Sequence, residues 1–85
     1  MRVNLLYFAR LREQLGLAQE TLALPDQITS VAALLDHLRV RGEPWHATLA
    51  LTQAYRVAVN QEMAELATTL HEGDEIAIFP PVTGG

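Results

Sequence analysis

The stretch Ser30-Val31-Ala32-Ala33-Leu34-Leu35-Asp36-His37-Leu38-Arg39 decides the fold of this chain. Its apolar residues recur at i, i+3, i+4 and i+7, namely at Val31, Leu34, Leu35 and Leu38. This spacing predicts an amphipathic helix with one apolar stripe. We expect Thr29 or Ser30 to cap its first turn, and Gly42 and Pro44 to end it. One strong amphipathic helix must bury its stripe against another layer of the domain.

The segments on either side of this helix have the character of strands. In Arg2 to Phe8, the residues Val3, Leu5 and Tyr7 alternate with Leu6 and Phe8, so both faces of the strand are apolar. Such a strand is expected at the centre of a sheet or under two layers. Further strands are predicted at 19–24, at 56–59, near Met63 and at 75–79, where Ile76 and Ile78 share one face and Ala77 and Phe79 the other.

Two shorter helices complete the prediction. Leu11 and Leu15 are four residues apart in 9–15, and Gly16 is a natural stop for that helix. The stretch 43–54 is read as a short helix or as irregular cover. The resulting fold class is α+β, a β-grasp (ubiquitin-like) fold with a mixed sheet packed on one main helix. Pattern alone leaves a ferredoxin-like arrangement as the alternative. The domain is expected to span 1–79, and 80–85 to form an extended C-terminal tail.

Composition excludes several classes of function. Among 85 residues there is no cysteine, so disulfides, thiolate metal sites and cysteine nucleophiles are excluded. The three histidines share no metal-ligand spacing, and we expect no metal and no bound cofactor. A net charge of −4 argues against binding to nucleic acid. No apolar run is long enough for a membrane helix and no signal peptide is recognised, so a cytoplasmic location is expected.

Charge is distributed unevenly along the chain. From Gln61 to Gly85 the charged residues are all acidic: Glu62, Glu65, Glu72, Asp74 and Glu75. A partner that handles this end of the chain would then present a basic surface. The alternative is an ordinary solvated acidic face. All six basic residues are arginines, so no lysine side chain is available to form an isopeptide bond with a sister molecule.

The last six residues, Pro80-Pro81-Val82-Thr83-Gly84-Gly85, extend beyond the last predicted strand. Fully extended, they reach roughly 20 Å. The two prolines fix φ and stiffen the first part of the tail. Suppose that another protein activates the terminal carboxylate with ATP: the backbone must then thread a narrow channel, and Gly84 and Gly85 allow this because glycine has no Cβ. A frayed chain end is the alternative interpretation.

Three segments of the chain resemble the small subunits of molybdopterin synthase, a family of ubiquitin-like sulfur carriers. These segments are Tyr7-Phe8-Ala9-Arg10-Leu11-Arg12-Glu13, Ala58-Val59-Asn60, and Glu72-Gly73-Asp74-Glu75-Ile76-Ala77-Ile78-Phe79-Pro80-Pro81-Val82-Thr83-Gly84-Gly85. The resemblance covers essentially the whole chain, and the last segment is its most specific part.

The resemblance implies a mechanism. An E1-like activating enzyme uses ATP to adenylate the terminal carboxylate of Gly85, and a sulfur donor replaces AMP to leave a thiocarboxylate. The tail then enters the large synthase subunit, where the sulfur passes to cyclic pyranopterin monophosphate to build molybdopterin. Two small subunits flank a large-subunit dimer in this family. The small subunit is not an enzyme on its own, since the catalytic groups belong to its partners.

The resemblance also assigns site residues. Gly85 and Gly84 carry the chemistry, Phe8, Arg12 and Phe79 map onto interface positions, and Pro80, Pro81, Val82 and Thr83 form the docking tail. From the sequence alone, Phe8 and Phe79 fit either the core or an exposed face opposite the main helix, and Arg12 fits a solvated helix charge.

Three other functions remain open: a β-grasp carrier serving thiamin or tRNA thiolation, a ubiquitin-like protein modifier, and a pure interaction module.

Overall fold

The structure is a computed structural model that describes residues 1–81. Along the chain it contains β1 (Arg2–Tyr7), α1 (Ala9–Leu15), β2 (Gln19–Ala23), α2 (Val31–Arg39), α3 (Trp45–Thr48), β3 (Arg56–Val59), β4 (Glu62–Met63) and β5 (Glu75–Phe79). The five strands form one sheet in the order β2-β1-β5-β3-β4. The central pair, β1 and β5, is parallel, and the other pairs are antiparallel. This mixed sheet with one main helix is the predicted β-grasp fold, and the ferredoxin-like alternative is wrong.

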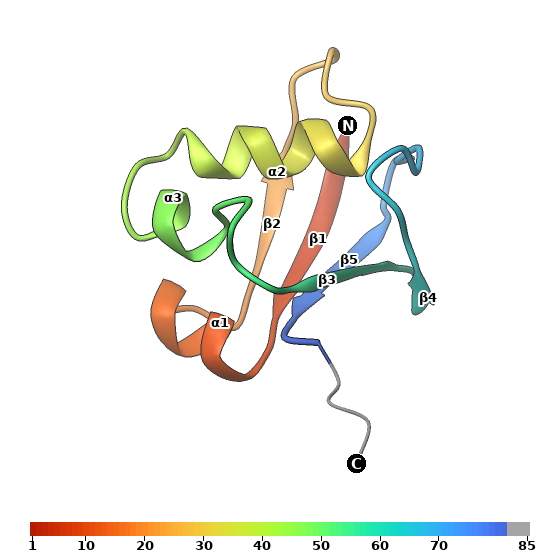
Figure 1. Ribbon diagram of the computed structural model, residues 1–85. Coiled ribbons are helices and arrows are strands. Elements are labelled where there is room, and N and C mark those ends of the chain that lie inside the picture. Colours follow the sequence, from red (N-terminus) through yellow and green to blue (C-terminus); the bar gives the residue numbers. More distant parts are fainter. Residues whose placement is uncertain (82–85) are drawn as a thin grey trace.

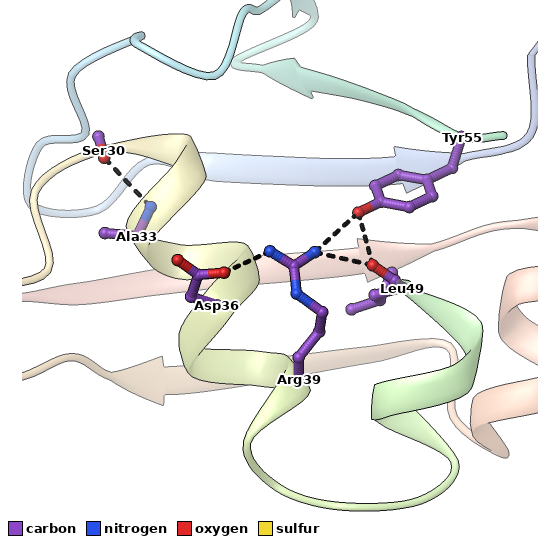
Figure 2. Close-up of polar contacts among 6 residues, drawn as sticks. All are labelled: Ser30, Ala33, Asp36, Arg39, Leu49 and Tyr55. Carbon is purple, nitrogen blue, oxygen red and sulfur yellow. Dashed lines mark hydrogen bonds and ion pairs between the residues drawn. The ribbon is translucent and has the colours of Figure 1, made fainter. Parts of the chain in front are cut away.

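The main helix begins where the sequence predicts. Ser30 is its N-cap, and its hydroxyl oxygen accepts a hydrogen bond from the Ala33 amide at 3.2 Å (Figure 2). This bond satisfies one of the amide groups that the first turn leaves without a helical partner. The helix ends at Arg39, slightly before the predicted stop, and Gly42 adopts a φ of 94° in the turn that follows.

The core lies between α2 and one face of the sheet, and α2 runs across the strands (Figure 1). Its stripe residues are all buried, together with the strand residues that alternate toward it: Val31, Leu34, Leu35, Leu38, Val3, Leu5, Tyr7, Ile76 and Ile78. Leu11 and Leu15 of α1 belong to the same cluster. Because all of these helix side chains pack on one side, the second face of the sheet has no helix over it within the described residues.

The stretch that the sequence left open, 43–54, contains both of the expected features. It begins with the four-residue helix α3 and continues as irregular chain. Arg39 anchors it to α2: its guanidinium donates to the Leu49 carbonyl at 2.7 Å and to the Tyr55 hydroxyl at 3.2 Å, and it forms an ion pair with Asp36 (Figure 2). Trp45 covers the end of the core, with its ring 5.6 Å from that of Tyr7.

A polar network fixes the turn before β5. Asp74 is buried, and its carboxylate accepts hydrogen bonds from the Asn60 side-chain amide at 2.9 Å and from the His71 amide at 2.8 Å. The Asn60 side-chain oxygen in turn accepts from the Glu75 amide at 3.0 Å. The network therefore joins the β3–β4 turn to the first residue of β5.

We expect Asp74→Ala to lower the free energy of unfolding by about 1–2 kcal/mol, because it removes the buried carboxylate that accepts the hydrogen bonds from Asn60 and His71. Chemical denaturation measures this change. The matched control is Asp26→Ala, because Asp26 is an exposed aspartate in another turn and should have almost no effect. Equal effects of the two substitutions would contradict a structural role for the network.

Candidate functional site

The site is built where β5 ends. Because β1 and β5 are parallel, the residues after β1 lie beside the residues that end β5, with Tyr7 opposite Ile78. The Phe8 amide donates to the Ile78 carbonyl at 3.2 Å, which extends this pairing by one residue. Figure 1 shows α1 and the end of β5 at the same edge of the molecule. Pro80 and Pro81, both half-buried, then lead the chain away from the sheet.

Phe8 joins the strand to the first helix. Its extended backbone makes it the N-cap of α1, and its carbonyl accepts bonds from the amides of Leu11 and Arg12. Arg12 is therefore held one helical turn from Phe8, and it is exposed. The structure thus brings together Phe8, Arg12, Phe79, Pro80 and Pro81. The other predicted site residues, Val82, Thr83, Gly84 and Gly85, lie outside the described residues.

An apolar surface covers the side of the sheet away from α2. We call it the open face, and its members are Leu6, Phe8, Ala58, Met63, Ala77 and Phe79. Strand register unites them, since Leu6 and Ala58 both lie opposite Ala77, and Met63 lies opposite Ala58. Phe8 is 45% exposed and Met63 58% exposed. Leu6, Ala77 and Phe79 are half-buried and Ala58 is buried, so the exposed part of this surface centres on Phe8 and Met63. Exposed apolar side chains on one face are typical of surfaces that bind other molecules.

This placement resolves the two alternatives for the aromatic residues. Neither Phe8 nor Phe79 belongs to the buried core, and both lie on the open face. The sequence did not single out Leu6, Ala58 or Met63. Met63 sits in a two-residue strand, which is too short for alternation to show which way its side chain points. Only its pairing with Ala58 places it on the open face.

We call the place where the chain leaves the sheet, at Phe79 and Pro80, the tail root. Within the described residues, the acidic residues of the last quarter of the chain do not surround it. Glu72 and Asp74 precede β5 and Glu75 begins it, whereas the tail leaves from the other end of that strand. The Arg2 amide donates to the Glu72 carboxylate at 3.0 Å, which places Glu72 beside the start of β1. A basic partner surface at the tail, expected from their nearness in sequence, therefore has no support from their positions.

A hollow of about 500 Å³ lies between α2 and the chain from Leu51 to Leu66. Its lining is mainly aliphatic, and its polar members include Asp36, Arg39 and Tyr55, which bond to one another or to the Leu49 carbonyl (Figure 2). Burial raises the pKa of Tyr55, so its hydroxyl stays protonated and acts as a structural donor. This hollow therefore presents no activated nucleophile or base.

A second cluster of titratable groups is also structural. The Tyr7 hydroxyl donates to the Glu20 carboxylate at 2.8 Å, and Arg41 binds the same carboxylate with two nitrogens, at 2.9 and 3.0 Å. Arg41 also lies over the Trp45 ring, 4.4 Å from its centroid. Burial raises the pKa of Tyr7 well above its usual value, so this phenol remains neutral. The cluster joins β1, β2 and the chain before α3.

Two further features are absent from residues 1–81. No three His, Asp or Glu side chains are grouped to hold a metal ion. No helix in this part of the chain is long and apolar enough to cross a membrane.

Comparisons with known proteins agree with this geometry. Residues 5–85 match the model of the ThiS family. The molybdopterin synthase sulfur carrier subunit of Haemophilus influenzae is 40% identical, over 98% of this chain and 99% of the relative. The human protein of the same name is 36% identical, over 99% of this chain and 94% of the relative.

Solved structures share the fold. A putative molybdopterin converting factor subunit 1 from Pyrococcus furiosus superposes with a TM-score of 0.79 at 26% identity, covering 96% of this chain and 99% of that one. The small archaeal modifier protein 1 of Haloferax volcanii gives 0.74 at 28% identity, covering 95% and 98%. With a ubiquitin-like fold, a full-length match and relatives that are sulfur carrier subunits, the chain belongs to the ThiS family.

Proposed function

We propose that this chain is the sulfur carrier subunit of a molybdopterin synthase and that it works through the carboxylate of Gly85. One observation carries the proposal: the full-length similarity to sulfur carrier subunits, together with a family match that runs through Gly85. The geometry of the described residues supports it, because the chain leaves the sheet at Pro80 beside an exposed apolar face.

The chemistry proceeds in two activation steps. A carboxylate is a poor acyl donor, so one of its oxygens attacks the α-phosphate of ATP in the activating enzyme and releases pyrophosphate. Hydrosulfide supplied by the sulfur donor then attacks the acyl carbon and releases AMP and a proton, which leaves a thiocarboxylate on Gly85. The terminal glycines favour both steps, because no side chain crowds the acyl carbon.

The loaded tail then delivers its sulfur in the active site of the large subunit, where cyclic pyranopterin monophosphate becomes molybdopterin. A dithiolene contains two sulfur atoms, so two loaded carriers are consumed per product, and an assembly of two small and two large subunits follows naturally. The acids and bases of this reaction belong to the large subunit. The open face is the surface on which that subunit docks, with Phe8, Phe79 and Met63 as apolar anchors. Because the activation consumes ATP, the proposal includes a cytoplasmic location for the cycle.

A second candidate function is a ubiquitin-like modifier of other proteins. The likeness to the archaeal modifier protein supports it, and the same adenylated tail would serve. The chain has no lysine, so lysine-linked chains of the protein with itself are excluded. Covalent adducts on lysines of other proteins would distinguish this function from sulfur transfer.

The carrier proposal predicts a change in intact mass. After incubation with ATP, the cognate activating enzyme and a sulfur donor, the chain should gain the mass difference between sulfur and oxygen at Gly85. Mass spectrometry of the whole chain and of its C-terminal peptide measures this.

The control for this experiment is the chain that lacks Gly84 and Gly85. It should fold normally, because neither residue belongs to the described domain, and it should gain no mass. If the activating enzyme is shown to be active on another carrier and the full chain still gains nothing, the sulfur carrier proposal is wrong.

The open face predicts which side chains the large subunit contacts. We expect Phe8→Ala and Met63→Ala each to weaken binding to the cognate large subunit by about tenfold or more, as truncation of an apolar anchor does. Isothermal titration calorimetry on the full chain gives the dissociation constants.

Val40→Ala is the matched control, since Val40 is 80% exposed and apolar but lies at the end of α2, outside the open face. Its affinity should stay within about twofold of the unsubstituted chain, because most surface contacts outside the anchors contribute little. Comparable losses for Val40→Ala and Met63→Ala would contradict docking on the open face.

A further inference from the structure

The two ends of β5 differ in charge. At its start lie Glu72, Asp74 and Glu75, and the Asn60–Asp74 bond brings the β3–β4 turn, with Glu62, to the same end. At its other end the neighbouring elements carry arginines. Since β5 is central in the sheet, β1 flanks it on one side and β3 on the other. Four acidic residues therefore gather where β5 begins, with Arg2 as the basic residue beside them, and arginines predominate where the tail leaves, where Glu13 is the acidic residue of α1.

Arg56 is the arginine closest in register to the tail root. It lies directly opposite Phe79 in the antiparallel β3–β5 pair, two residues before Ala58 on the same strand. Strand alternation therefore places Arg56 on the same side as Ala58, at the margin of the open face, and at this edge of the sheet Arg56 also borders the hollow beside α2. It is exposed and forms no ion pair among the described residues. Arg39 and Arg41, by contrast, are paired with Asp36 and Glu20.

Arg12 holds the corresponding position on the other side of β5. It follows β1 by one helical turn and is exposed. Arg10 adds positive charge nearby, because its guanidinium donates to the carbonyl of Ala54, two residues before Arg56. That contact is with a neutral group and leaves its charge uncompensated.

We propose that Arg12 and Arg56 form a basic collar around the tail root, and that the large subunit of the synthase presents carboxylates opposite it. This inference rests on the proposed function, because it names the chemistry of the surface that receives the tail. A partner that covers the open face also covers the margin where Arg56 stands. When a partner removes water from an arginine there, the arginine must pair with an anion. Otherwise the free-energy cost of desolvating the charge exceeds what the contact contributes. Opposed charges also accelerate the encounter and align the tail with its channel.

The collar reverses the expectation drawn from the sequence. The acidic run before β5 suggested a partner with a basic surface. Arg12 and Arg56, which lie at the tail root, instead favour a partner with an acidic surface. Arg56 and the acidic residues are close along the chain. The antiparallel β3–β5 pairing separates them to opposite ends of the sheet.

The test compares two charge reversals in the full chain, Arg56→Glu and Arg2→Glu. Arg2 is the matched control, because it is an exposed arginine on the same side of the sheet but at the far end of β1. Both substitutions change the net charge equally. Affinity and association rate for the purified large subunit are measured at low and high salt by surface plasmon resonance.

We expect Arg56→Glu to weaken binding by about tenfold or more at low salt and to slow association, with the difference shrinking at high salt. Arg56→Gln should fall between the unsubstituted chain and Arg56→Glu, and Arg2→Glu should stay within about twofold of the unsubstituted chain. Thermal unfolding of each variant shows whether the fold is retained.

Equal losses for Arg56→Glu and Arg2→Glu would overturn the collar, since net charge alone would then explain them. Unchanged binding of Arg56→Glu, or a loss confined to the activating enzyme, would overturn it as well. In each of these cases the unsubstituted chain still binds the large subunit, so the proposed function stands. If the unsubstituted chain fails to bind, the proposed function fails and the collar fails with it.

Discussion

Parallel pairing of β1 with β5 at the centre of the sheet is the constraint on which the rest of the structure depends. These strands come from opposite ends of the domain, so the chain must complete every other element before the pair closes. Parallel strands also end at the same edge. The chain following β1, with Phe8 and Arg12, therefore stands beside the place where β5 releases Pro80. A tail root surrounded by specific side chains is a direct consequence of this topology.

The side chains of these two strands form two apolar surfaces, one on each face of the sheet, which differ in burial. Val3, Leu5, Ile76 and Ile78 are buried beneath α2, and such burial contributes roughly 25 cal/mol per Å² of apolar area removed from water. Leu6, Ala77 and Phe79 point the other way and are only half-buried. A small domain gains stability from the first surface. The second keeps apolar area in contact with water, which is unfavourable until another protein covers it.

The local sequence pattern predicted most helices and strands. It failed where contacts between residues far apart in the sequence determine the conformation. The spacing of Leu34, Leu35 and Leu38 identified α2, and alternation identified β1 and β5. The stretch 43–54 was unreadable because Arg39, outside it, holds it through the Leu49 carbonyl and Tyr55. The direction of Met63 follows from its pairing with Ala58, which no local pattern contains. A basic partner surface at the tail stays a prediction, and the positions of the acidic residues do not support it, because they lie where β5 begins and the tail leaves from its other end. The tail itself was recognised by its residue types, and its role as carrier remains a proposal.

The choice of basic residue fits a carrier of an activated acyl group. An acyl adenylate on Gly85 is electrophilic, and a lysine near the tail root would be a potential nucleophile whenever it lost its proton. A guanidinium stays protonated and supplies positive charge without that reactivity. All six Lys or Arg positions of this chain are arginine, including Arg39, which holds the chain after α3, and Arg56, which lies opposite Phe79. In the proposed carrier, arginine thus combines positive charge for docking with chemical inertness toward an activated tail.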